Sequence, residues 1–318
     1  DVTAFLGGIS LNLQSNFVYG ESEWLVVEAD EYDRSFLHLH PEWAIITSLD
    51  PDHLDIYGTE EKMRRTYKEF AGQAANTLVH ESVVEQDWEL PSAIYGQSGD
   101  TTYDDLNFEK LHTDFTFSGK KASTRVALPM PGQHNVSNMT AALTLAEKLG
   151  VDVTQFSEAV ASFRGIYRRF EVHHHSDSLT FIDDYAHHPS EIAAAMDTAR
   201  KLFPQRKLVV IFQPHLFSRT RDFLEGFAKE LSKADETLLL EIYPAREKSI
   251  EGVTSSALLA KMSLEHKSLV SKAELVNILE ESIKEPVILL TLGAGDIDKE
   301  VPKVAQWAKT NLPNKTSI

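Results

Sequence analysis

The stretch KLVVIFQPHLFSRTRD, residues 207–222, decides the fold that the sequence predicts. It opens with an almost wholly apolar run, which is typical of a strand buried on both faces of a parallel sheet. A polar loop with His215 and Arg219 follows the run directly, and a helical pattern comes next. Because the same order recurs along the second half of the chain, we predict a doubly wound α/β domain there.

The other elements of this domain follow from apolar runs and helical periodicity. Strands are predicted at residues 170–175, 179–182, 207–212, 236–241 and 287–291, and helices at residues 190–202, 220–233, 254–263 and 272–283. We place the domain boundary near Ser162 to Gly165. Residues 1–163 therefore form the first predicted domain and residues 164–318 the second.

The first domain is also predicted to be α/β. Trp24–Val27 and Ala44–Thr47 are predicted as buried strands of a parallel sheet. Thr59 is the expected N-cap of a helix that runs to Ala75, because two glutamates follow it where negative charge is favourable. Further along, a small antiparallel sheet is expected between residues 77 and 128, and helices at 136–149 and 153–162.

Composition excludes several classes of protein. The 318 residues carry 31 Lys and Arg against 48 Asp and Glu, so the net charge is 31 − 48 = −17, which opposes binding to nucleic acid. The chain has no cysteine, which excludes disulfides and thiolate chemistry. No apolar run approaches the roughly 18 residues of a membrane span, and the first residues lack the pattern of a secretion signal. We therefore expect a cytoplasmic protein without membrane contact.

Acidic side chains follow both predicted strands of the first domain. Glu28 opens the stretch EADEYD, and His53 lies in the stretch DPDHLD after the second strand. Because ligands bind at the carboxyl ends of strands in such sheets, Glu28 and His53 are candidates for one shared metal site. The alternative is a solvated acidic loop.

Two further stretches could contact a nucleotide. Asn135 and Asn138 in GQHNVSN lie on one face of a predicted helix, where their amides could bind a heteroaromatic ring or serve as ordinary caps. Arg168 and Arg169 offer guanidinium groups that suit phosphate, or form an exposed pair.

Polar residues are densest in the stretch DDYAHHPSE, residues 183–191, which follows one strand and precedes a helix with Ser190 as its expected N-cap. This loop and the loop of His215 and Arg219 should face one crevice. Near the end of the chain, GAGD at residues 293–296 predicts a tight turn that presents backbone N–H groups to that crevice. These clusters also fit a metal-dependent phosphohydrolase that uses Asp50, Asp52, His53, Asp183, Asp184 and His187. A binding protein with an inactive site is a further alternative.

Seven stretches in sequence resemble the Mur ligase family, most closely its branch that adds L-alanine to UDP-N-acetylmuramate. They are EADEYDRSFLHLHP (28–41), DPDHLDIYG (50–58), PGQHNVSN (131–138), YRRFE (167–171), DDYAHHPSE (183–191), FQPHLFSRTRD (212–222) and GAGD (293–296). The resemblance covers nearly the whole chain. It implies a central ATPase domain, a C-terminal α/β ligase domain, and an amide-forming reaction through an acyl phosphate in peptidoglycan synthesis.

The resemblance also implies cofactors, substrates and residue roles. ATP and Mg²⁺ would be the cofactors, and UDP-N-acetylmuramate and L-alanine the substrates. Glu28 and His53 correspond to magnesium ligands, Asn138 to an adenine contact, and Arg169 and Asp184 to residues that hold ATP. Tyr185, His188, His215 and Arg219 correspond to loops that close over the reacting carboxylate and the amino acid.

The chain departs from the family pattern in three ways. No G-x-x-x-x-G-K-[ST] motif for phosphate occurs, the UDP-substrate domain is missing, and Leu216 stands where many relatives have arginine. The chain also starts with Asp1 rather than methionine. We expect a C-terminal portion of a longer enzyme, inactive by itself. Within the family, the alternative is the recycling ligase that attaches a tripeptide to the same UDP-sugar.

Overall fold

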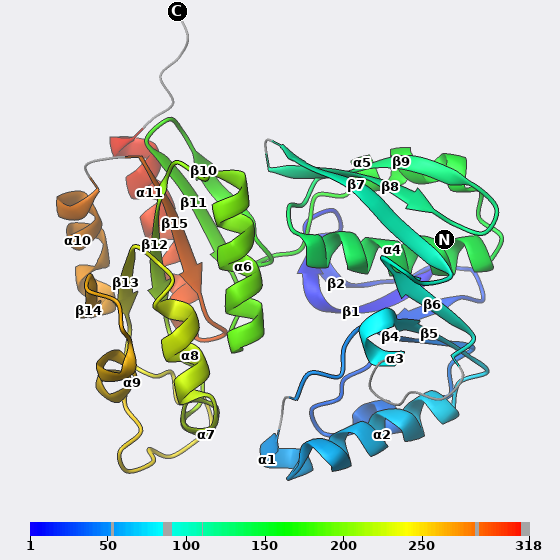
Figure 1. Cartoon of the computed structure of the whole chain (residues 1–318), viewed down its shortest axis with the longest axis horizontal. Coiled ribbons are helices and arrows are strands. Elements are labelled where there is room, and N and C mark those ends of the chain that lie inside the picture. The colour runs from blue at the N-terminus through cyan, green and yellow to red at the C-terminus, as the bar shows by residue number, and fades with distance from the viewer. Residues whose placement is uncertain (52–53, 85–90, 110, 284–285, 313–318) are drawn as a thin grey trace, which may run out of the picture. The chain divides into compact units, whose positions relative to one another are not determined.

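The computed structural model describes residues 1–51, 54–84, 91–109, 111–283 and 286–312. The chain forms two compact units, Asp1–Tyr167 and Arg168–Ile318, which we call the first and second units (Figure 1). The division falls a few residues after the boundary that we predicted. Among the described residues, no helix combines the length and the apolar character needed to cross a membrane.

The second unit contains the predicted doubly wound sheet, in the strand order β10-β11-β15-β12-β13-β14. β10 is antiparallel to β11, and the other neighbours are parallel. The prediction of a strand at residues 207–212 is confirmed. The strands are β10 (Glu171–His175), β11 (Leu179–Asp184), β12 (Lys207–Phe212), β13 (Glu236–Leu239), β14 (Lys267–Leu269) and β15 (Val287–Leu292).

Helices cover both faces of this sheet (Figure 1). One apolar core lies between the sheet and α6, α8 and α9, and a second lies between the sheet and α10 and α11. Strands β11 and β15 are buried along their whole length, which explains the nearly continuous apolar sequence of β15. The helices are α6 (Pro189–Leu202), α7 (Phe217–Asp222), α8 (Leu224–Leu231), α9 (Ser255–Lys261), α10 (Leu275–Ser282) and α11 (Val301–Asn311), with short 3₁₀ turns η3 (Lys272–Glu274) and η4 (Asp296–Lys299).

Some elements of the second unit differ from the prediction. The helix expected at residues 220–233 is two helices, α7 and α8, because Phe223 between them leaves the helical conformation. β14 and α11 were not predicted, since β14 has only three residues and α11 lies beyond the last pattern that we assigned.

The larger sheet of the first unit has the order β4-β5-β6-β7-β8-β9. Neighbours from β4 to β7 are parallel, and β7, β8 and β9 are antiparallel. The predicted antiparallel segment is therefore right for β7 to β9, but these strands extend the parallel sheet rather than form one of their own. The strands are β4 (Trp43–Ile46), β5 (Asn76–His80), β6 (Ala93–Gly96), β7 (Thr101–Glu109), β8 (His112–Ser118) and β9 (Ser123–Leu128).

Helices α2, α4 and α5 of the first unit follow the predicted pattern, whereas α1 and α3 were not predicted. The Thr59 hydroxyl accepts the N–H of Lys62 at 3.3 Å, which confirms Thr59 as the N-cap of α2. Helix α4 covers the antiparallel strands together with α5 and forms their apolar core. The helices are α1 (Leu54–Tyr57), α2 (Glu60–Gly72), α3 (Glu81–Val84), α4 (Gln133–Lys148) and α5 (Phe156–Ala161), with 3₁₀ turns η1 (Ser35–His38) and η2 (Val153–Gln155).

A separate three-stranded sheet, β2-β1-β3, begins the chain. Its strands are β1 (Thr3–Ser10), β2 (Ser15–Val18) and β3 (Leu25–Val27). The prediction that residues 24–27 are buried is wrong, because Leu25 and Val26 are 55% and 49% exposed. An apolar run shows only that a strand can be buried, and burial also needs a second layer over it.

The chain passes from one unit to the other across a single peptide. The N–H of Tyr167 donates to the carbonyl of Ile9 at 2.9 Å, within the first unit. The carbonyl of Arg168 accepts the N–H of Tyr185 at 2.7 Å, within the second unit. Arg168 has a φ of 58°, in the left-handed region that few arginines adopt. The backbone is thus held on both sides of the junction.

Candidate functional site

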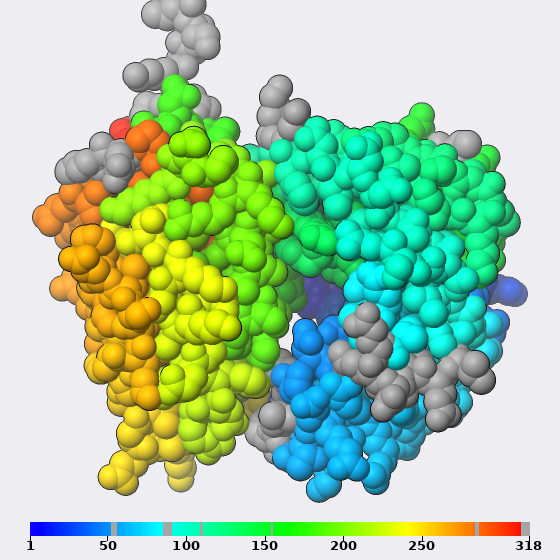
Figure 2. All heavy atoms as spheres, in the orientation of Figure 1, coloured from blue at the N-terminus to red at the C-terminus, as the bar shows by residue number. Residues whose placement is uncertain are grey.

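Loops from four strands meet at the carboxyl edge of the second unit's sheet. They follow β11, β12, β13 and β15, which are parallel neighbours and so end at the same edge. Helix α7 and the loop before α9 lie at this end of the unit (Figure 1), and the loop projects there as a yellow segment in the space-filling view (Figure 2). This edge is where such sheets bind ligands.

His215 lies at the centre of these loops. Its ring stacks on Tyr243, with centroids 5.8 Å apart and planes 18° from parallel. The ring of His187, from the loop after β11, lies 6.2 Å away and faces it edge-on. Nη1 of Arg219 lies 3.3 Å from Nδ1 of His215. The structure therefore brings the loop of His187 to the loop of His215 and Arg219, as predicted, and adds Tyr243.

The surroundings of His215 keep its ring neutral. Burial lowers the pKa of His215 to about 4, and the positive charges of Arg219 and Arg246 act in the same direction. Because a guanidinium only donates hydrogen bonds, Nδ1 accepts from Arg219 and the ring proton belongs on Nε2. At neutral pH the pair therefore offers a permanent positive charge and a neutral N–H donor.

The adjacent residues His187 and His188 have different positions. His188 is the N-cap of α6, where its Nδ1 accepts the N–H of Ser190 at 3.4 Å and its ring packs 4.5 Å from that of Phe223. The predicted N-cap, Ser190, is thus wrong, because Pro189 begins the helix. The catalytic role predicted for His188 stays a prediction, while the ring that faces His215 belongs to His187.

Asp184 is buried, and its carboxylate accepts hydrogen bonds from backbone N–H groups instead of facing an exposed ligand site. Its two carboxylate oxygens accept the N–H groups of Phe170 and Ala186 at 2.7 and 2.8 Å. Burial raises the pKa of Asp184 to about 6, although these hydrogen bonds and Arg169 oppose the rise. Asp184 therefore supports the loop of Tyr185 from beneath.

Arg169 and Tyr185 are the accessible members of the predicted nucleotide contacts in the second unit. The Arg169 guanidinium lies 5.4 Å from the centroid of the Tyr185 ring. Its ion pair with Glu191 is 3.8 Å long, and the Arg169 side chain is 47% exposed. A guanidinium so loosely held can turn toward a phosphate.

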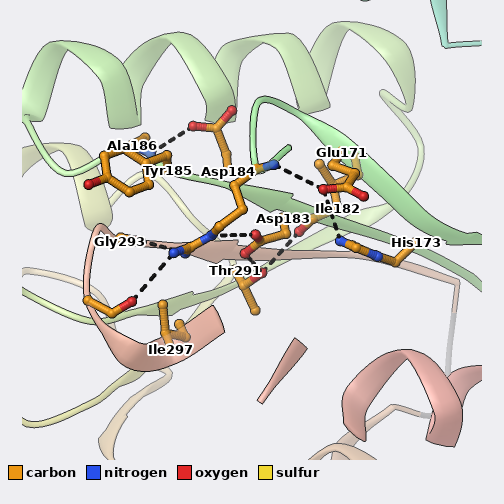
Figure 3. Close-up of polar contacts among 12 residues, drawn as sticks. Glu171, His173, Ile182, Asp183, Asp184, Tyr185, Ala186, Thr291, Gly293 and Ile297 are labelled. Carbon is orange, nitrogen blue, oxygen red and sulfur yellow. Dashed lines mark hydrogen bonds and ion pairs between the residues drawn. The ribbon is translucent and has the colours of Figure 1, made fainter. Parts of the chain in front are cut away.

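The Arg168 side chain is buried and makes its hydrogen bonds within the second unit. The prediction that Arg168 contacts phosphate is therefore wrong. Its Nε donates to Asp183 at 2.8 Å, and both side chains are nearly inaccessible. Its other nitrogens donate to the carbonyls of Gly293 and Gly295 at 2.6 and 3.4 Å, and Asp183 also accepts the hydroxyl of Thr291 (Figure 3). Arg168 thus ties the turn after β15 to the start of the unit.

The glycine turn after β15 differs from the prediction in the groups it presents. The N–H of Gly293 donates to the carbonyl of Asp184 at 3.3 Å, so it does not point to a ligand. Gly293 has a φ of 136°, and a Cβ there would lie 2.5 Å from the carbonyl oxygen of Gln213. The turn needs glycine for its backbone path and its close packing.

The first unit contributes the remaining predicted site residues, Glu28, His53 and Asn138. Glu28 is exposed, and its carboxylate accepts the N–H of Gly7 at 2.8 Å. His53 lies outside the described residues. Asn138 is exposed on α4, while the side-chain amide of Asn135 donates to the carbonyl of Pro131 at 2.7 Å, as a cap does.

The described residues do not support the metal-dependent hydrolase. Asp183 and Asp184 are occupied by Arg168 and by backbone N–H groups. Across the ranges that the structure describes, no three histidine or carboxylate side chains gather as a metal site would require.

Sequence reasoning missed Tyr243 and Glu247, which follow β13. Tyr243 stacks on His215, and Glu247 accepts two hydrogen bonds from Ser218 in α7. The signal that could have found them is their position, since polar residues after β13 must lie at the same sheet edge as those after β12.

Comparison with known proteins gives a consistent result. Residues 8–146 match the model of the Mur ligase middle domain, and residues 168–295 match that of the Mur ligase glutamate ligase domain. The chain is 42% identical over 315 residues to a UDP-N-acetylmuramate–L-alanine ligase of Flavobacterium johnsoniae, a match that covers 98% of this chain and 69% of the relative.

Two solved structures have a similar fold. A UDP-N-acetylmuramate–alanine ligase of Thermotoga maritima aligns with a TM-score of 0.80 and 28% identity, over 97% of this chain and 69% of that one. The MurF ligase of Thermotoga maritima in complex with ADP aligns with a TM-score of 0.73 and 18% identity, over 97% of this chain and 74% of that one. The second match supports the fold alone.

Proposed function

Because the chain belongs to the Mur ligase family, we propose that it serves the ATP-dependent addition of L-alanine to UDP-N-acetylmuramate in peptidoglycan synthesis. The observation that carries the proposal is the 42% identity to an L-alanine ligase over 98% of this chain. We propose a cytoplasmic location on the same ground, since the reaction consumes ATP.

The chemistry needs an activated carboxylate, because a free carboxylate is a poor electrophile. Transfer of the γ-phosphoryl group of ATP to the muramate carboxylate gives an acyl phosphate and ADP. The amine of L-alanine then attacks the acyl carbon, the C–O bond to phosphate breaks, and the amine loses a proton. The products are the amide, ADP and inorganic phosphate, so atoms and charge balance.

Arg219 and His215 suit the binding of the amino acid. A guanidinium binds a carboxylate strongly, and a neutral imidazole with its proton on Nε2 can donate beside it. The low pKa of His215 keeps a second positive charge away from the reacting amine. We assign this pair to the carboxylate of L-alanine, and His187 to the same wall of the site.

The accessible groups near Tyr185 suit the nucleotide. Arg169 would bind phosphate, Tyr185 would pack against it, and Asp184 would hold their loop in place. Asn138, exposed on α4, would donate to and accept from the edge of adenine.

Magnesium fits the residues present. Mg²⁺ is usually bound by one or two carboxylates together with substrate phosphates, so a single exposed carboxylate such as Glu28 is an adequate protein ligand. The ion would neutralise charge on the phosphates during transfer. His53 is the second proposed ligand.

The test is phosphate release by the gene product that carries this chain, given magnesium, ATP and UDP-N-acetylmuramate, with and without L-alanine. We expect release that requires both the UDP-sugar and L-alanine. Release that requires a tripeptide in place of L-alanine would identify the recycling ligase. Release without either acceptor would contradict a ligase.

A further inference from the structure

Residues 243–247, in the loop after β13, hold the loop that carries His215. The N–H of Tyr243 donates to the carbonyl of Pro214 at 2.8 Å, and the carbonyl of Tyr243 accepts the N–H of Leu216 at 2.9 Å. The Tyr243 ring stacks on His215 between these two bonds. The first residue of the segment therefore fixes the backbone and the ring of His215 together.

The last residue of the segment, Glu247, holds the start of α7. Its carboxylate accepts the N–H of Ser218 at 2.9 Å and the Ser218 hydroxyl at 2.5 Å, and it also accepts the N–H of Phe217. Leu216, which precedes the helix, has a φ of 68° and no oxygen in its side chain, so it cannot cap these groups. Glu247 takes the place of the missing cap from 29 residues away.

The position of Arg219 depends on the hydrogen bonds between Glu247 and the first turn of α7. Arg219 follows Ser218 in α7 and is only 7% exposed, so its direction is set by the first turn of the helix. That direction places its guanidinium 3.3 Å from His215. A turn without Glu247 would leave the N–H groups of Phe217 and Ser218 without their charged partner, which stabilises them more than a neutral group would.

We propose that Glu247 is a positioning residue for the ligase reaction, which fixes the first turn of α7 so that Arg219 stays against His215 and binds the carboxylate of the incoming amino acid. The proposal rests on the proposed function and adds to it a residue that touches no substrate. Glu247 acts through Ser218 and Phe217 on Arg219, and the 243–247 segment holds both ends of the amino-acid site.

The kinetic test is Glu247→Gln in the gene product that carries this chain. The glutamine amide keeps one acceptor but turns a donor toward one of the groups that Glu247 now accepts. We expect the KM for L-alanine to rise about tenfold, in line with the loss of one charged hydrogen bond, and the KM for ATP to stay unchanged. An equal rise in the KM for L-alanine and the KM for ATP would indicate a general structural defect and would overturn the proposal.

The chain offers a matched control. Glu81 accepts the N–H groups of Gln97 and Ser98 at 2.9 and 2.8 Å and the Ser98 hydroxyl at 2.5 Å, the same set of contacts in the first unit. Glu81→Gln should leave the KM for L-alanine unchanged. A similar rise in this control would overturn the assignment of the effect to the site.

Histidine NMR gives a second readout that needs no activity. The charged and titratable groups that face His215 are Arg219, Arg246, His187, Tyr243 and Glu247. Loss of the negative charge of Glu247 alone would lower the pKa of His215, whereas release of Arg219 would raise it. We expect a rise in Glu247→Gln, with the His215 signal identified by its absence in His215→Gln.

The two readouts separate the two proposals. If the gene product forms no amide with L-alanine, the proposed function fails, and the direction of the His215 shift still tests the positioning role. A lower or unchanged pKa of His215 would overturn that role. Should Glu247→Gln fail to fold, Ser218→Ala keeps the carboxylate, removes one contact and should change the KM and the pKa in the same directions by less.

Discussion

At the centre of the site, the Arg219 guanidinium contacts the neutral imidazole of His215. Their proximity makes each residue depend on the other, because the positive charge disfavours protonation of the ring. Above a pH of about 4 the ring therefore stays neutral, and within this pair only Arg219 carries a charge that can bind a carboxylate.

Replacing Arg219 tests this dependence. In Arg219→Gln we expect kcat/KM for L-alanine to fall about tenfold to a hundredfold, through loss of a charged hydrogen bond. The pKa of His215 should rise from about 4 toward that of a free histidine, because one of its neighbouring charges is gone. The acid limb of kcat/KM against pH should move to higher pH. An unchanged rate of amide formation would remove Arg219 from the site.

Asp184 gives a prediction about stability and pH. Folding raises its pKa from 3.8 to about 6, so the native state binds a proton more tightly than the unfolded chain. The stabilisation is complete below about pH 4 and is lost as pH rises through about 6, by about 3 kcal/mol in total. Between pH 4 and pH 7, the unfolding free energy of Asp184→Asn should therefore rise relative to wild type.

Urea unfolding at several pH values measures this difference. His215, whose pKa is lowered by folding, has the opposite effect in the same range but is present in both proteins, so it cancels. A constant difference between variant and wild type across this range would show that Asp184 does not titrate there.

At the scale of elements, the carboxyl edge of the second unit's sheet is held by contacts between loops. Arg168 joins the turn after β15 to the start of the unit, and Glu247 joins the segment after β13 to α7. Both use a charged side chain to satisfy backbone groups of another loop. The loops are therefore ordered as a set, which suits a site whose groups must keep fixed distances.

The turn at Gly293 provides a test at this scale. Gly293→Ala places a methyl group 2.5 Å from the carbonyl oxygen of Gln213 at a φ of 136°, so the turn must shift. We expect a loss of about 2–4 kcal/mol in unfolding free energy and reduced activity. Gly252→Ala, with a φ of 78° and nothing within 4 Å, should cost only about 1 kcal/mol. Equal losses would show that steric contact is unimportant at Gly293.

Elements were predictable where local patterns decide them, and site details were not. β12 and the cap of α2 follow from an apolar run and from Thr59. The sequence HHPS does not tell which histidine faces His215, because Pro189 changes where the helix begins. The burial of Arg168 and the hold of Glu247 on Ser218 depend on partners in distant loops, which local patterns cannot reveal.

At the scale of the whole molecule, exposed apolar side chains are concentrated in one region. Of the large apolar residues that are exposed in the described structure, those from Val2 to Val27 outnumber all others. Phe5 and Phe17 lie together, with ring centroids 4.8 Å apart and exposures of 50% and 44%. Exposed apolar side chains that gather in this way bind hydrophobic probes and favour self-association.

This surface gives a prediction for the 318-residue chain. It should bind the dye 8-anilinonaphthalene-1-sulfonate, and replacement of Phe5 and Phe17 together by threonine should reduce the fluorescence and the light scattering. Leu149→Thr removes an exposed leucine outside the sheet and serves as the control. If the double variant binds as much dye as wild type, the sheet is not the binding surface.

The hold of Glu247 on α7 also has a consequence for the order of folding. Ser218 follows β12 and Glu247 follows β13, and the two residues are 29 positions apart in the chain. Closing a loop of this length costs chain entropy, and the pairing of β12 with β13 brings the two segments to the same sheet edge. We expect these two strands to pair before the first turn of α7 becomes fixed. Arg219 and His215 would then reach their final geometry only after this pairing.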